Sequence, residues 1–386
     1  MAIWSFPTRI IFGAGEIARL SDEALAVGMK RPLLVTDAGV EHTGVLAAVL
    51  AALKNDQLAV ATFTGVEGNP TEDNIAAGAR AYSAHRADGV IAVGGGSPMD
   101  AGKLIALRAC CALSFEELDD SIDGGRHVPA DVPPIITVPT TAGTGSEVGR
   151  AAVVTVRSTQ RKTVVFSPRL LARVAILDPN LTRSMPAPVT AATGFDALTH
   201  CVEAYLAKGD HPMADAIALA GIDLVAKYLE RAVADGNDME ARGMMMKAAM
   251  MGAVAFQKGL GACHSLAHPL SSEHGLHHGL ANALLLPHVL DLNAPAIFEP
   301  CARLADTLHL RAQDPVATIR DWVVELVDAI GLPARAPVPG ADEALVARLA
   351  ALVPSEKLYL ATNPRPASAE EIARVYRAVL GLTPSA

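Results

Sequence analysis

The sequence changes character near residue 185, and this change constrains the fold more than any other feature. Before that point, short apolar runs rich in β-branched residues alternate with helical stretches, and several of these runs end at a glycine. Strands that alternate with helices are typical of a parallel sheet covered by helices. We therefore expect an α/β domain over residues 1–185, with buried strands at 31–36, 89–93, 134–138 and 174–177.

Beyond residue 185 the sequence contains long segments rich in Ala, Leu and Met, such as residues 214–232 and 239–256. Their apolar residues recur at helical spacing, with almost no strand pattern. Pro186 and Pro188 lie at the junction, and Ser368 with Glu371 has the spacing of a capping box that begins the last helix. We expect a second, α-helical domain over residues 186–386, since 386 residues are enough for two domains of ordinary size.

Composition excludes several classes of protein. The chain is 51% hydrophobic but has no uninterrupted apolar stretch of about 18 residues, so we expect no membrane span. A formal net charge of −9 gives no electrostatic reason to bind nucleic acid. The first residues lack the basic and apolar regions of an export signal, and none of the five cysteines has CxxC spacing. We therefore expect a cytoplasmic protein with reduced thiols.

Histidines are concentrated in one part of the sequence. Six of the 12 lie in a 25-residue stretch: His264, His268, His274, His277, His278 and His288. His264 and His268 are four residues apart, as are Asp196 and His200 upstream, so each pair projects from one face of a helix. One carboxylate with several neutral imidazoles suits Fe(II) or Zn(II) better than Ca(II) or Mg(II). The pattern predicts a metal site.

The alternative is that these histidines lie on a solvated helix face. Their neighbours, however, are mostly Ala, Leu, Gly and Cys. Burying an imidazole without a partner among such residues would cost about 2 kcal/mol or more. A metal ion would remove that cost, so the surroundings favour the metal site. Cys201 and Cys263 adjoin the histidines but point about 100° away from them on a helix, as packing residues do.

Glycine-rich turns follow three of the expected strands, including a short one at residues 10–12. Residues 94–103, GGGSPMDAGK, open a helix with bare backbone N–H groups, which can bind a phosphate, although such a turn can also be only a tight connection. Residues 13–18, GAGEIA, imitate the dinucleotide fingerprint, but GxGxxA is short and common. Residues 139–148, PTTAGTGSEV, could line the other side of a nucleotide, or Thr144 and Ser146 could simply cap a helix.

Asp37 lies at the end of an expected strand. A carboxylate at this place accepts hydrogen bonds from an adenosine ribose and repels a 2′-phosphate, which favours NAD over NADP. The alternative is a turn aspartate before Gly39.

Together these motifs resemble the iron-containing (group III) alcohol dehydrogenase family. FGAGE, the NPT of residues 69–71, GGGSPxDxxK, PTTAGTGSEV, GFDALTHCVEAY, GLGACHSLAHPL and HHGLANALLLPHV occur in the family's order over residues 10–290. TNPRP at residues 362–366 resembles its C-terminal tail. The stretches SEVGRAAVV, TAATGFDALTHC and AFQKGLGACHSLAHPL are most similar to the 4-hydroxybutyrate dehydrogenase branch. Ala172 departs from the proline of many relatives.

The resemblance implies a Rossmann-like N-terminal domain that binds NAD, an all-α C-terminal domain, an active site in the cleft between them, and a homodimer or larger homo-oligomer. It implies Fe(II), with Zn(II) possible, on Asp196, His200, His264 and His278, and a further active-site histidine at His268. His274 and His277 match no required position. The implied nucleotide contacts are Asp37, Asn69, Gly95, Gly96, Ser97, Asp100, Thr140, Thr141, Thr144, Lys162 and Leu181.

The implied activity is the reversible oxidation of a primary alcohol or ω-hydroxy acid, such as 4-hydroxybutyrate, to the aldehyde. The metal ion acidifies the hydroxyl, the alkoxide transfers a hydride to nicotinamide, and His268 relays the proton. Arg150 or Arg157 could bind a substrate carboxylate, or both could be surface residues.

Two other functions remain as alternatives. A sugar-phosphate cyclase or glycerol-phosphate dehydrogenase would need more Lys and Arg beside the histidines. A metallohydrolase would use the ligands without a nucleotide, and it would leave the glycine-rich loops without a purpose, as would metal storage.

Overall fold

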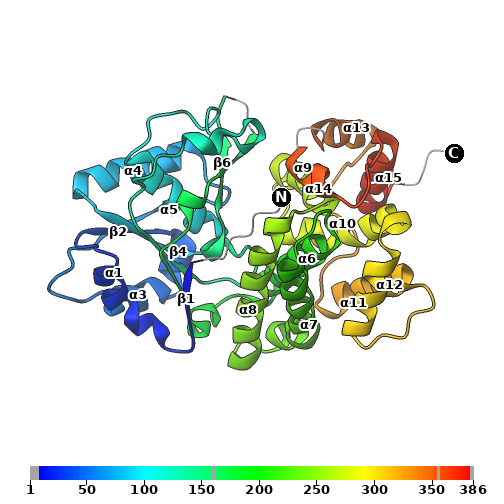
Figure 1. Ribbon diagram of the computed structural model, residues 1–386, viewed down its shortest axis with the longest axis horizontal. Helices are drawn as coiled ribbons and strands as arrows, with labels where there is room; N and C mark the ends of the chain where they lie inside the picture. Colours follow the sequence, from blue (N-terminus) through cyan, green and yellow to red (C-terminus); the bar gives the residue numbers. More distant parts are fainter. Residues whose placement is uncertain (1–7, 159–160, 354–356, 383–386) are drawn as a thin grey trace. The chain divides into compact units, whose positions relative to one another are not determined.

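The structure of the protein, a computed structural model, describes residues 8–158, 161–353 and 357–382. The chain forms two compact units. One consists of Ser5–Met185 and is called the sheet unit below; the other includes Pro186–Ala386 and is called the helical unit. In Figure 1 the sheet unit is coloured from blue to green and the helical unit from green to red.

The sheet unit contains a six-stranded parallel sheet with the order β1-β8-β5-β4-β2-β3. Its strands are β1 (Arg9–Phe12), β2 (Pro32–Asp37), β3 (Ala61–Val66), β4 (Gly89–Gly94), β5 (Ile135–Pro139) and β8 (Val174–Leu177). Its α-helices are α1 (Leu20–Ala26), α2 (Ala38–His42), α3 (Val45–Ala52), α4 (Glu72–His85) and α5 (Gly96–Arg108). The expected parallel α/β arrangement is confirmed. The four expected buried strands correspond to β2, β4, β5 and β8, and the short strand expected at residues 10–12 corresponds to β1.

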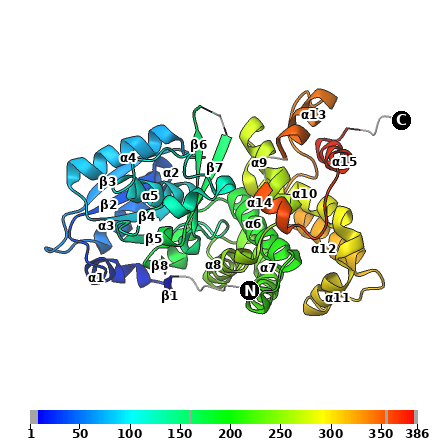
Figure 2. The same cartoon turned by 45° about the horizontal axis from the view of Figure 1, so that its top comes forward.

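Helices cover both faces of this sheet, which explains why its strands are nearly continuous apolar runs. Successive side chains of β4 enter two different cores: Val90 and Ala92 pack in one, and Ile91 and Val93 in the other. The first core contains residues of α4 and α5, and the second contains residues of α1 and α3. Figure 2 shows α4 above the strands and α1 below them.

Three strands were not anticipated. β3 lies at the edge of the sheet and most of its residues are partly exposed, so it lacks the apolar run that marks its neighbours. β6 (Ala151–Val156) and β7 (Arg161–Phe166) form a separate antiparallel pair. Buried and half-buried residues alternate strictly along β6, and this two-residue period was a usable signal in the sequence.

The helical unit contains ten α-helices and no strand within its described residues. The helices are α6 (Ala187–Leu206), α7 (Pro212–Ala234), α8 (Met239–Ala255), α9 (Ala262–His274), α10 (His278–Asn293), α11 (Phe298–Thr307), α12 (Pro315–Ala329), α13 (Glu343–Leu352), α14 (Lys357–Thr362) and α15 (Ala369–Leu380). α15 begins at the expected capping box of Ser368 and Glu371. In the part of the chain that the structure describes, no helix combines the length and apolarity needed to cross a membrane.

Eight short 3-10 helices complete the described structure. They are η1 (Glu16–Arg19), η2 (Asp120–Ile122), η3 (Gly124–His127), η4 (Ser146–Val148), η5 (Pro168–Leu170), η6 (Pro179–Thr182), η7 (Phe256–Lys258) and η8 (Ala294–Ala296).

α6 is the central helix of the helical unit, and every residue from Thr190 to Leu206 is buried. α7, α8 and α10 all pack against it. α10 approaches α6 closely at Gly279, where a Cβ atom would lie 1.9 Å from the backbone oxygen of Ala192. Only glycine fits at this crossing, which brings the first turn of α10 against the middle of α6.

Candidate metal centre and nucleotide-binding loops

α6 presents three charged or titratable side chains on one face. Asp196, His200 and Glu203 are spaced by four and three residues, so they lie above one another on the helix. Their exposed fractions are only 3%, 6% and 5%. Such groups are rarely buried unless they are paired or bind a metal.

α9 and α10 bring two further histidines to this face. Nε2 of His264 lies 3.8 Å, and Nε2 of His278 3.7 Å, from Oδ1 of Asp196. Nδ1 of His200 lies 4.0 Å from Oδ2 of the same carboxylate. The rings of His200 and His264 are stacked, with their centroids 4.6 Å apart. The carboxylate of Asp196 is therefore surrounded by three imidazoles.

The geometry fits a divalent metal ion. Asp196, His200 and His264 each offer a ligand atom, and these atoms all lie within 4.8 Å of one another. Bonds of about 2.1 Å to one ion would place ligand atoms about 3.0 to 3.5 Å apart, so small movements would complete the coordination. His278 lies outside this group of three but beside Asp196, and its side chain is 28% exposed. A donor set of one carboxylate and imidazoles suits Fe(II) or Zn(II).

Glu203 holds His264 in place. Its Oε2 lies 2.5 Å from Nδ1 of His264, and its two oxygens accept the backbone N–H groups of Cys263 and His264. A proton on Nδ1 leaves the lone pair of Nε2 directed toward Asp196, as in the carboxylate–histidine pairs of metal sites. Glu203 was not anticipated from the sequence, although its position three residues after His200 was a signal.

Asn282 was also missed. It is completely buried on α10, four residues after His278. Its Nδ2 donates to Oδ1 of Asp196 at 2.8 Å and lies 3.4 and 3.3 Å from Nε2 of His264 and His278. The amide therefore orients the carboxylate and faces two of the expected ligands. The thiol of Cys263 donates to the backbone oxygen of Asn282 at 3.5 Å, and burial raises the pKa of this thiol well above its usual value.

His268 lies one turn beyond His264 on α9 and is half-buried. Its ring centroid is 5.4 Å from that of His278. It therefore adjoins the cluster at its partly exposed side. His274 and His277 are exposed at the end of α9 and the start of α10.

Several of the expected nucleotide-binding residues lie at the carboxyl ends of neighbouring strands of the sheet. Asp37 is the last residue of β2, and the glycine turn and the threonine-rich loop begin where β4 and β5 end; these three strands are neighbours. The backbone N–H of Thr140 donates to the oxygen of Gly94 at 2.9 Å, and a Cβ at Gly96 would lie 2.8 Å from Cγ2 of Thr144. Oγ of Ser97 accepts the backbone N–H of Asn69 at 3.3 Å. The glycine turn thus contacts both the threonine-rich loop and Asn69.

The glycine turn begins the 13-residue helix α5 without a side-chain cap. Backbone N–H groups at such a helix start can bind a phosphate. The GAGEIA segment leads instead into η1, a four-residue 3-10 helix, and therefore lacks a comparable helix start.

Five of the expected contacts have structural partners of their own. Oδ1 of Asp37 accepts the N–H of Val40, so Asp37 caps α2 while ending β2. Asp100 accepts from Oγ of Ser146 at 2.6 Å and from the N–H of Val153 at 3.1 Å. Asp37 and Asp100 thus each have a structural role besides the expected contact with the nucleotide. Lys162 pairs with Thr155 across the β6–β7 ladder, and Leu181 is buried in a core of the sheet. Thr141 packs close to Gly95.

A buried lysine connects the glycine turn to the threonine-rich loop. Lys103 is completely buried and donates to Oγ of Ser146 and the oxygen of Ala151, both at 2.8 Å. Burial lowers the pKa of Lys103 and raises that of Asp100, and it raises the pKa of Glu147 to about 7. This network fixes the start of β6 to α5.

The two candidate substrate arginines differ in their surroundings. Arg157 forms an ion pair with Asp73, and its side chain is 72% exposed, as a surface arginine is. Arg150 is half-buried, and burial lowers the pKa of its guanidinium. Arg150 is therefore the better candidate for binding a carboxylate.

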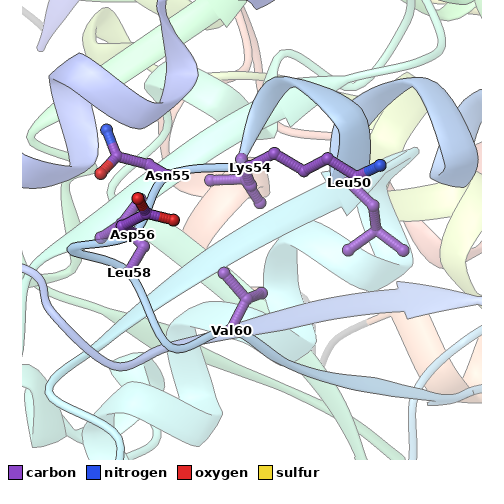
Figure 3. A pocket seen from close by; sticks show the side chains of 7 residues that line it. Leu50, Lys54, Asn55, Asp56, Leu58 and Val60 are labelled. Carbon is purple, nitrogen blue, oxygen red and sulfur yellow. The ribbon is translucent and has the colours of Figure 1, made fainter.

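A surface groove lies elsewhere on the sheet unit. It is lined by Leu50, Leu53, Lys54, Asn55, Asp56, Leu58 and Val60, between the end of α3 and the start of β3 (Figure 3). The expected nucleotide-binding residues lie instead at the carboxyl ends of β2, β4 and β5, so this groove is not part of that candidate site.

Comparison with known proteins identifies the class. The sequence model described as iron-containing alcohol dehydrogenase matches residues 7–179, and that of the C-terminal part of the family matches residues 190–380. The chain is 39% identical over 385 residues to 4-hydroxybutyrate dehydrogenase of Cupriavidus necator, which covers 97% of this chain and 99% of the relative.

Solved structures agree. A crystal structure of 1,3-propanediol oxidoreductase superposes with a TM-score of 0.92 at 35% identity and covers 98% of this chain and 100% of that one. The sulfoacetaldehyde reductase of Bifidobacterium kashiwanohense, in complex with NAD+, gives a TM-score of 0.88 at 30% identity, with 98% of both chains covered. The protein is thus an oxidoreductase of the alcohol dehydrogenase type. It belongs to the iron-containing alcohol dehydrogenase family, as the sequence motifs predicted.

Replacing Glu203 with Gln tests the support of His264. The amide cannot accept from His264 and both backbone N–H groups as a carboxylate does, so we expect the affinity for a divalent ion to fall by about tenfold or more. Competition with a chromophoric chelator measures it. Unchanged affinity in a folded Glu203→Gln protein would contradict the role assigned to Glu203.

Proposed function

We propose that this protein catalyses the metal-dependent, NAD-linked oxidation of a primary alcohol or ω-hydroxy acid, such as 4-hydroxybutyrate, to the aldehyde, and the reverse reaction. The observation that carries the proposal is the buried cluster of Asp196, His200 and His264, with His278 beside it. The relative named for 4-hydroxybutyrate and the relative bound to NAD+ support the substrate class and the nucleotide.

Asp196, His200, His264 and His278 would hold the ion, which we propose to be Fe(II), with Zn(II) as the other ion that this donor set accepts. When bound, a divalent ion supplies Lewis acidity that lowers the pKa of an alcohol hydroxyl. Glu203 and Asn282 keep His264 and Asp196 oriented toward that position.

His268 is the candidate proton relay. Its ring lies beside His278 and is half-buried, so its nitrogens can take a proton from the site and release it to water. An imidazole has an ordinary pKa near neutrality, which suits proton transfer in both directions.

In the sheet unit, the N-terminus of α5 and the threonine-rich loop would bind the phosphates, and Asp37 the adenosine ribose. Hydride transfer requires the nicotinamide to reach the alcohol at the metal. We further propose that the protein acts in the cytoplasm as a homodimer or larger homo-oligomer, as the family resemblance implies.

The direct test is NADH formation, followed by absorbance, with a panel of primary alcohols, diols and ω-hydroxy acids. We expect activity with Fe(II) or Zn(II) restored to chelated protein and little activity before restoration. A matched series of 4-hydroxybutyrate and 1-butanol isolates the effect of the carboxylate. Undiminished oxidation by metal-free protein would refute the proposal.

Two histidine substitutions on α9 should separate binding from chemistry. His264→Ala removes a ligand, so we expect loss of both metal and activity. His268→Ala should lower kcat by about 100-fold, the lower part of the range for proton transfer by a positioned group, while metal content stays near that of the wild type. Metal analysis beside kcat measures both. Loss of metal in His268→Ala would show that His268 is a ligand.

Asp37→Ser tests nucleotide choice without removing the helix cap. Serine can still accept the N–H of Val40, but it no longer repels a 2′-phosphate. We expect the ratio of kcat/KM for NAD to that for NADP to fall by about tenfold or more. An unchanged ratio in a stable variant would assign Asp37 to capping alone.

A further inference from the structure

The N-terminus of α9, the helix that carries His264 and His268, is capped by side chains from elsewhere in the chain. Oδ1 of Asn363 accepts the N–H of Ala262 at 3.0 Å, while Glu203 accepts the N–H groups of Cys263 and His264. The first three N–H groups of α9 are therefore satisfied by α6 and by the C-terminal TNPRP segment. A helix start usually receives such bonds from its own N-cap side chain.

Gly261 shows that this arrangement is specific. It is the N-cap residue, and a Cβ there would lie 2.8 Å from both Oδ1 of Asn363 and Oε1 of Glu203. Serine, aspartate or any other capping residue would displace those two oxygens. The side chains of Asn363 and Glu203 thus leave no room for a capping side chain at residue 261.

Asn363 also connects α9 to the helix that carries His278. It is 1% exposed, and its Nδ2 donates to Oδ1 of Asn293 at 2.8 Å and to the oxygen of Arg365 at 2.6 Å. Asn293 is the last residue of α10 and donates in return to Oδ1 of Asn363 at 3.1 Å. One buried amide therefore links the start of α9 to the end of α10.

Two further residues of the C-terminal region, Thr362 and Tyr376, reinforce the link. Oγ1 of Thr362 donates to the oxygen of Leu260 at 2.7 Å, just before α9. The hydroxyl of Tyr376, a completely buried residue of α15, donates to the oxygen of Leu266 at 2.9 Å, one turn along α9 from Ala262. α9 is thus held at two points by residues about 100 positions later in the chain.

We propose that Asn363, supported by Tyr376, is a positioning residue for the metal centre: it fixes the first turn of α9 so that His264 meets Asp196. This inference rests on the proposed function. Asn363 touches neither ligand side chains nor any reacting atom, so it acts through the backbone of Ala262. His264 lies in the first turn of α9 together with Ala262. A shift of this helix start therefore moves His264 directly.

The experiment uses the full chain and compares four variants. Asn363→Ala removes the distant cap, Asn363→Asp keeps an oxygen for Ala262, and Tyr376→Phe removes a single hydroxyl. Asp314→Ala is the matched control, because Asp314 caps α12, which carries no expected ligand. Competition with a chelator measures the affinity for Zn(II), the visible spectrum of the Co(II) form reports coordination, and denaturation of metal-free protein reports stability.

We expect Asn363→Ala to lower metal affinity by about tenfold or more and to alter the Co(II) spectrum, and Asn363→Asp to lose less. Asp314→Ala should keep affinity within about twofold although it too loses a helix cap. Wild-type affinity in Asn363→Ala, or an equal loss in Asp314→Ala, would overturn the inference.

If Asn363→Ala does not fold, Tyr376→Phe decides. A measurable loss of metal affinity with a wild-type circular dichroism spectrum supports the inference, and unchanged affinity overturns it. Failure of the wild-type protein to bind any divalent ion would instead refute the proposed function, so the two failures are distinguishable.

Discussion

The burial of two carboxylates on one helix is the constraint on which the rest of this structure depends. Asp196 and Glu203 are both nearly inaccessible to water, and an isolated buried carboxylate would be very costly. Glu203 is compensated by the first turn of α9, whose N–H groups it accepts. Asp196 is compensated by Asn282 and faces imidazoles that fit a cation. The arrangement of α6, α9 and α10 follows from these requirements.

The sheet unit follows a different principle, in which backbone geometry rather than charge places the site. In a parallel sheet the carboxyl ends of all strands lie on the same side. Segments far apart in the sequence, such as Asn69 and Ser97, therefore come into contact there. The buried Lys103 then ties two of these segments together. Phosphate recognition in this unit would therefore depend mainly on backbone groups and glycines.

Much of this was predictable from the sequence, because the signals were periodic or local. The apolar runs of β2, β4, β5 and β8 and the helical spacing of Asp196 and His200 depend only on nearby residues. β3 was missed because an edge strand needs no apolar run.

Glu203 and Asn282 were missed because their importance depends on which helix packs opposite them, and Asn363 lies about 100 residues from the helix start that it caps. Asp37 shows a further limit, since one side chain ends a strand, caps a helix and remains a candidate ribose contact.

All four proposed ligands, and every side chain that orients them, belong to the helical unit. Coordination therefore requires no donor from the sheet unit. A bound ion would depend for its donors on the folding of the helical unit alone. The division of the polypeptide would thus allow substitutions in the sheet unit to change its affinity for a nucleotide without removing a metal donor.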